Sequence, residues 1–186
     1  LDILSGDDIV IAGGATLSSG LNPIPEFGYG ATGAHNLLAG VNNSGLVDAD
    51  EVATIIIGEA ELRAAGQPIT LSAEAIDARR AQFEAGDLFA GIFDPPAPGI
   101  APRNDGGLLS PECLEGDLCI GTITAAGIAS LGPESGITGL PNRIAIAGNV
   151  SADSIIVRGR DDIVLGPSAG NAALAAASSL YVASPT

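Results

Sequence analysis

The chain contains no lysine, methionine or tryptophan, and aromatic residues make up only 3% of its 186 residues. Large aromatic side chains normally contribute much of the core of a globular enzyme. Here the apolar content is Ile, Leu, Val and Ala, while 26 Gly and 12 Pro indicate many turns. This composition favours a narrow core in which similar small aliphatic side chains stack on one another.

Positive charge is also scarce. Seven arginines oppose 22 acidic residues, which gives a formal net charge of −15. Such a balance argues against nucleic acid and anionic membrane surfaces as partners. No apolar run approaches the roughly 20 residues of a membrane-spanning helix. The chain begins with LDIL and ends with LYVASPT, both strand-like, so we expect a segment of a longer secreted or cell-surface protein.

Cysteine and histidine are limited to three residues. Cys113 and Cys119, in CLEGDLC, favour a disulfide that closes a short loop, with two free thiols as the alternative. His35 lies in GAHNL with no serine or cysteine motif near it. We therefore expect His35 to be a surface or loop residue rather than a catalytic base.

What the sequence does contain is a repeated phrase. Residues 153–166 read DSIIVRGRDDIVLG, two short apolar runs around a polar corner. The chain opens with the same pattern, in which Ile3 matches Val157, and DDIVI at 7–11 matches DDIVL at 161–165 without a gap. A weaker internal match pairs Ile76 with Val150 and Phe83 with Val157. Recurrence of a strand–corner–strand unit is typical of repeat proteins.

The corners of this unit have a recognisable chemistry. Glycine adopts the backbone angles of a tight turn, and aspartate can accept hydrogen bonds from backbone N–H groups there. The corner residues predicted in this way are Gly6, Asp7, Asp8, Gly86, Asp87, Gly116, Asp117, Asp161 and Asp162.

The repeat predicts one all-β domain over 1–186, a right-handed parallel β-helix (β-solenoid) whose passes take roughly 20–25 residues. Gly- and Pro-rich stretches predict insertions near 20–50, 94–116 and 131–141. Residues 73–85 have helical propensity, but the repeat predicts a strand. Residues 172–179 fit either a helix or a strand.

Three phrases, SGDDIVIAGGATLSSG, IAIAGNVSADSIIVRGRDDIVLG and ITLSAEAIDARRAQFEAGDL, resemble repeats of filamentous-haemagglutinin-like exoproteins of two-partner secretion. The resemblance covers the regular blocks and implies a right-handed parallel β-helix with an adhesive role. The family's Asn-Pro-Asn-Leu secretion signature is absent, since Asn22-Pro23-Ile24 departs from it. The resemblance therefore implies a stem region rather than the secretion domain.

Paired carboxylates offer a catalytic alternative. Asp7-Asp8 and Asp161-Asp162 would suit a carbohydrate-active β-helix enzyme, in which two acids flank a glycosidic bond. Adjacent residues of a strand face opposite sides, however, and the pair recurs at equivalent places. Both facts favour a structural corner.

One stretch partly fits a calcium loop. With Gly45 as the turn glycine, the ligand positions fall on Asn42, Ser44, Asp48 and Glu51. Gly40 stands where the first Asp ligand is expected, which favours an ordinary polar loop. Calcium is the single cofactor that the sequence suggests.

We therefore expect a non-catalytic extracellular structural or adhesive β-solenoid, a segment of a secreted or cell-surface adhesin; the alternative is the carbohydrate-active enzyme. Open ends would pair with further passes of a parent chain or with other copies, giving a filament. A host-surface or glycan ligand is the other candidate partner.

Overall fold

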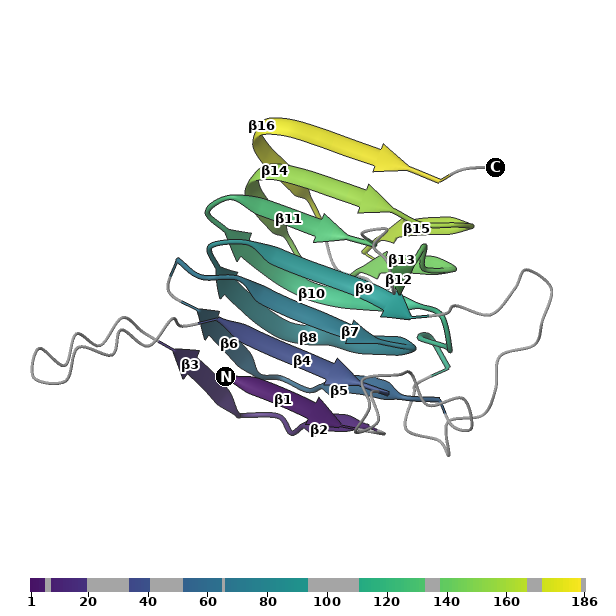
Figure 1. Ribbon diagram of the computed structural model, residues 1–186. Helices are drawn as coiled ribbons and strands as arrows, with labels where there is room; N and C mark the ends of the chain where they lie inside the picture. The colour runs from purple at the N-terminus through teal and green to yellow at the C-terminus, as the bar shows by residue number, and fades with distance from the viewer. Residues whose placement is uncertain are drawn as a thin grey trace, which may run out of the picture.

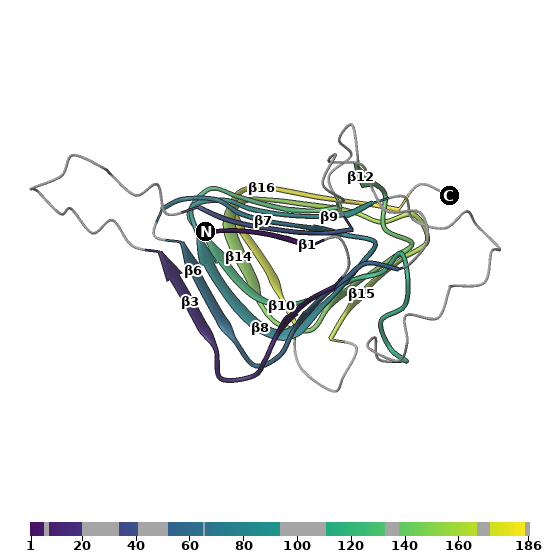
Figure 2. The ribbon, with the colours of Figure 1, turned by 60° about the horizontal axis from the view of Figure 1, so that its bottom comes forward.

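The computed structural model describes residues 1–5, 8–19, 34–40, 52–64, 66–93, 111–132, 138–166 and 172–184. In these residues every regular element is a β-strand (Figure 1). All strands belong to one sheet, and each neighbouring pair is parallel except β12 with β9. The sheet nearly closes around an axis, so the strands surround an interior on three sides (Figure 2). We call the parallel strands on each side a ladder, and one circuit of the chain a pass.

Ladder 1 contains seven strands. They are β1 (Asp2–Ser5), β4 (His35–Ala39), β7 (Ile69–Ala73), β9 (Leu88–Phe93), β11 (Ile128–Leu131), residues 154–158 of β14 (Val150–Arg158) and residues 179–183 of β16 (Leu174–Ala183). The two-residue strand β12 (Thr138–Gly139) pairs with β9 from outside this path.

Ladders 2 and 3 contain six strands each. Ladder 2 consists of β2 (Ile9–Ile11), β5 (Thr54–Ile57), the first part of β8 (Ala75–Ala85), the first part of β10 (Leu118–Ala125), β13 (Arg143–Ile146) and β15 (Asp162–Leu165). Ladder 3 consists of β3 (Thr16–Ser19), β6 (Glu61–Ala64) and the remaining parts of β8, β10, β14 and β16.

The interior is built from columns of aliphatic side chains. Alternate residues of a strand point inward, and parallel pairing places each inward residue on its counterpart in the next pass. In ladder 2 the column reads Ile9, Ile55, Ile76, Leu118, Ile144 and Ile163. The four middle members are fully buried. One apolar cluster thus runs along the axis, as the aliphatic composition predicts.

The opening phrase is paired as its sequence predicts. Ladder 1 connects Ile3 with Val157 through Leu37, Leu71, Ala90 and Leu131, and ladder 2 connects Ile9 with Ile163. The weaker match is wrong, because it pairs Ile76 of ladder 2 with Val150 of ladder 3. Ile123 pairs with both Phe83 and Val150 on ladder 3, so Phe83, not Ile76, shares a column with Val150. Alternation of apolar residues has the same period on all three sides and does not distinguish them.

Both segments with helical propensity are strands. Residues 75–85 form β8, as the repeat predicts, and β16 covers most of 172–179. Inward-facing Ala81 and Phe83 of β8 are buried, whereas Gln82 and Glu84 are exposed. Burial of alternate residues between two neighbouring strands outweighs the helical propensity of Ala, Glu and Arg.

The expected insertion at 20–50 is interrupted by a core strand. β4 pairs with β1 and β7, and Leu37 and Ala39 are buried. Residues 20–33 and 41–51 lie outside the described part, as do 94–110 of the second insertion and 133–137 of the third. Within the described residues, no helix has the length and apolar character that a membrane crossing requires.

Leu62 provides a test of the core. It is fully buried on ladder 3 between Leu17 and Phe83. We expect Leu62→Ala to lower the free energy of unfolding by about 2–5 kcal/mol, because it removes packed methyl groups and leaves a cavity. Denaturant titration measures this, with exposed Arg63→Ala on the same strand as the control. Equal effects of the two substitutions would contradict the inward placement of Leu62.

Candidate functional site

The acidic residues at the corners bind backbone groups of neighbouring passes. Asp8 Oδ1 accepts hydrogen bonds from the Thr54 backbone N (2.9 Å) and from its hydroxyl (2.6 Å). Asp87 Oδ1 accepts one from the Ile128 N (2.8 Å). Buried Glu74, which the sequence reasoning missed, accepts one from the Ala53 N (2.8 Å). These carboxylates therefore satisfy N–H groups where the ladders turn.

The other predicted corner residues differ in their surroundings. Gly116 has a φ of 83°, in the left-handed region that glycine favours. A Cβ on Gly86 would lie 2.4 Å from the Gly66 carbonyl oxygen, so close passage of two backbones requires glycine there. Asp161 directly precedes β15 and Asp162 is its first residue, and both are exposed. Gly6 and Asp7 lie outside the described residues.

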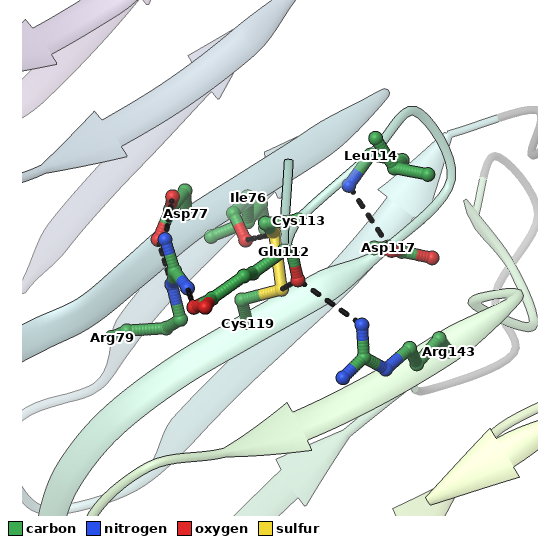
Figure 3. The surroundings of a disulfide bond; sticks show 9 residues. All are labelled: Ile76, Asp77, Arg79, Glu112, Cys113, Leu114, Asp117, Cys119 and Arg143. Carbon is green, nitrogen blue, oxygen red and sulfur yellow. Dashed lines mark hydrogen bonds and ion pairs between the residues drawn. A yellow bond between two sulfur atoms is a disulfide. The ribbon is translucent and has the colours of Figure 1, made fainter. Parts of the chain in front are cut away.

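A disulfide holds a loop against the outer face of ladder 2 (Figure 3). Cys113 is bonded to Cys119, and Cys119 is part of β10. Parallel pairing sets Cys119 beside Asp77 on one side and Ala145 on the other. Cys113, Cys119 and Ala145 form a second, small buried cluster. The disulfide thus covers part of the outside of the sheet.

Arg79 connects this loop to the sheet. Its guanidinium forms two hydrogen bonds with the Asp77 carboxylate, both 2.9 Å, and a third with Glu112. The Glu112 backbone oxygen accepts a hydrogen bond from Arg143 Nη1 (3.1 Å). The pKa of Arg79 is raised, chiefly by the hydrogen bond with Asp77. The negative charge of Asp77 and the interaction with Glu112 also raise it, whereas burial acts in the opposite direction. Glu112 is therefore held by two arginines, one on each side of the disulfide (Figure 3).

Asp117 is a buried acid of the loop. It is 6% exposed, and its carboxylate accepts a hydrogen bond from the Leu114 N (3.0 Å). Burial raises the pKa of Asp117, while the Leu114 hydrogen bond and the charge of Arg143 act in the opposite direction. Beside the loop lies a hollow of about 460 Å³ whose charged lining residues are Asp77, Arg79, Arg80 and Glu112.

A second polar site lies on the outer face of ladder 3. It is a groove of about 170 Å³ over β6, β8 and β10. Its polar lining residues are Glu61, Arg63, Gln82, Glu84, Thr122 and Thr124. Arg63 lies between two carboxylates, 2.9 Å from Glu61 and 3.7 Å from Glu84. The sequence reasoning missed this groove, although polar residues at alternate positions of ELRA and QFEA could have indicated an outward face.

His35 is not a surface residue, which corrects the expectation from the sequence. It faces inward on β4, is 1% exposed, and its Nε2 lies 3.0 Å from the Arg63 carbonyl oxygen. The calcium-loop residues Asn42, Ser44, Asp48 and Glu51 lie outside the described residues. In the part of the chain that is described, no three His, Cys, Asp or Glu side chains are grouped so that they could hold a metal ion.

Comparison with known proteins finds no matching family model, no similar curated protein and no similar solved structure. The resemblance to filamentous-haemagglutinin-like repeats therefore remains a prediction from sequence.

The disulfide can be tested by removal. We expect Cys113→Ala with Cys119→Ala to lower the free energy of unfolding by about 2 kcal/mol, because cross-linking restricts the unfolded chain, if only over a short loop. Hydrogen exchange of the amides in 111–117 should also increase. Leu114→Ala, which trims an exposed side chain of the same loop, is the control. Unchanged stability and unchanged exchange would contradict a holding role for the disulfide.

Asp117 predicts a pH dependence. Because its folded-state pKa is raised, the folded protein retains this proton to a higher pH than the unfolded chain. Stability from this group is present below the unfolded pKa and is lost as the pH rises through the folded pKa. Asp117→Asn should remove that loss, so its stability relative to the parent should increase across this interval in urea titrations. A difference in stability that stays constant with pH would contradict the assignment.

Proposed function

We propose that the chain is a right-handed parallel β-helix and a non-catalytic structural and adhesive segment of a secreted or cell-surface protein. The observation that carries this proposal is the pairing of successive passes on all three ladders around one apolar cluster. Such a fold presents long, repetitive outer faces on a rigid support.

The use of the acidic residues supports a structural role. Asp8, Glu74 and Asp87 accept hydrogen bonds from backbone N–H groups of neighbouring passes. Asp77 and Glu112 are bound by Arg79. These five carboxylates thus help to hold neighbouring passes or the disulfide loop in place.

The groove on ladder 3 is the surface we assign to adhesion. Its threonine hydroxyls, glutamine amide, carboxylates and guanidinium present both donors and acceptors in rows one strand apart, about 4.8 Å. A sugar chain offers hydroxyl groups that can pair with both kinds of group. A host-surface glycan that is neutral overall therefore fits this face better than an anionic one, given the net charge of −15.

The same groove favours one second candidate, a carbohydrate-active enzyme. Glu61 and Glu84 flank Arg63 on adjacent strands, and a pair of carboxylic acids across a sugar chain is the usual arrangement for glycoside hydrolysis. Both side chains are substantially exposed, at 40% and 66%, whereas the general acid of a glycosidase commonly lies in an apolar pocket.

A glycan array with the purified chain tests the two candidates together. For an adhesin we expect binding to at least one neutral glycan, a loss of about tenfold or more in Arg63→Ala because charged hydrogen bonds are lost, and no change in Ser151→Ala, which alters the same ladder outside the groove.

Release of reducing ends from a bound polysaccharide, abolished by Glu61→Gln or Glu84→Gln, would establish the enzyme instead. Failure to bind any glycan, or equal binding by Arg63→Ala and the parent, would contradict adhesion through this groove.

A further inference from the structure

The sheet has two ends at which strand edges have no neighbour among the described residues. At one end β1, β2 and β3 each pair on one side only, with β4, β5 and β6. At the other end β15 pairs only with β13, and β16 only with β14. We call these the N-end and the C-end; they are the purple and yellow ends in Figure 1. Unpaired N–H and C=O groups along such edges are templates for further strand pairing.

Apolar exposure is concentrated at these two ends. Nine large apolar side chains are exposed among the described residues, and seven of them are at the ends: Leu1, Leu4 and Val10 at the N-end, and Leu165, Leu180, Tyr181 and Val182 at the C-end. The inward columns also end here, with Ile3 and Leu17 at one end and Ile163 and Leu174 at the other. Both ends therefore expose the edge of the apolar interior.

At the C-end, the described residues of β16 lack the usual protection of edge strands. β16 is ten residues long, LAAASSLYVA, and contains no charged residue and no proline. Natural edge strands are commonly short, charged or interrupted by proline, which prevents uncontrolled pairing. A long, uncharged edge with half-exposed Leu180, Tyr181 and Val182 is suited to a partner strand.

We propose that the C-end binds the N-end of a second copy of this chain, head to tail, with the second copy rotated by about a third of a turn around the axis. The inference rests on the proposed β-helix and names its partner. All three ladders run in one direction, so the two ends are complementary, and a head-to-tail contact continues parallel pairing. Because such a contact does not close, repetition gives a filament.

The rotation follows from the number of strands. Ladder 1 has seven strands and the other ladders have six, so residues 179–183 of β16 rise one strand spacing above the ends of ladders 2 and 3. A copy placed without rotation would pair β1 with residues 179–183 but leave β2 and β3 two strand spacings, about 9.6 Å, from the last strands of their ladders, which is one spacing too far to pair.

A third of a turn removes this gap. It sets β1 on β15, β2 on residues 174–176 of β16, and β3 on residues 179–183. With Leu1 on Ile163 and Ile3 on Leu165, apolar residues meet inside, and Asp2 faces Val164 rather than Asp162.

Assembly is tested by light scattering after size exclusion over a range of concentrations, with electron microscopy of the same samples. The parent chain should form concentration-dependent oligomers and filaments. Leu180→Lys should raise the midpoint concentration at least tenfold, because it places a charge in the junction. Ile128→Lys, which alters an exposed apolar residue between the ends, should assemble like the parent.

A parent chain that stays monomeric up to its solubility limit would overturn the proposal and leave these edges to further passes of a longer chain. Equal assembly of Leu180→Lys and the parent would also overturn it. Neither result bears on glycan binding by the groove, so the adhesive proposal stands or fails separately.

The rotation is tested by oxidative cross-linking of two double variants that share one cysteine. Asp2→Cys with Val164→Cys should give a series of covalent oligomers, because the rotated copy sets these residues side by side. Asp2→Cys with Tyr181→Cys should give none, although it would in an unrotated stack. The opposite result would overturn the rotation.

Discussion

Parallel pairing between successive passes is the constraint on which this structure depends. Each strand contributes a few residues to a ladder, and each pass buries its inward side chains only against the passes beside it. The column Ile55, Ile76, Leu118, Ile144 is fully buried because four separate segments stack in register. The corner carboxylates and close-packed glycines serve the same pairing, since they let the chain turn without leaving backbone N–H groups unsatisfied.

Because inward side chains hold the passes together, the outer faces are available for other uses. Ladder 2 carries a disulfide-held loop whose Glu112 is bound by Arg79 and Arg143. Ladder 3 carries a polar groove over three neighbouring strands. The two ends expose apolar edges instead. The adhesion that we propose along a side and the assembly that we propose at the ends therefore use different surfaces.

The sequence predicts the all-β parallel architecture from its repeated phrase. The same short corner that separates Ile3 from Ile9 also separates their counterparts, Val157 and Ile163. It fails for Ile76 and Phe83, since β8 continues around a corner without a glycine and alternation looks alike on every side. It also fails for His35, a polar residue at an inward position whose partner, the Arg63 carbonyl, is set by the fold. The cysteine spacing suggests the disulfide, but the arginines that hold Glu112 come from strands far away in the chain.

The central claim is the order of strands along one ladder, and a distance measurement tests it most directly. Ser18, Arg63, Glu84, Thr124 and Ser151 are successive partners on ladder 3. Spin labels at Ser18→Cys and Ser151→Cys should therefore lie four strand spacings apart, about 19 Å between backbones. Pulsed electron–electron double resonance measures this distance. A narrow distribution near that distance is the predicted result. A broad distribution, or one centred much farther away, would contradict the stacked passes.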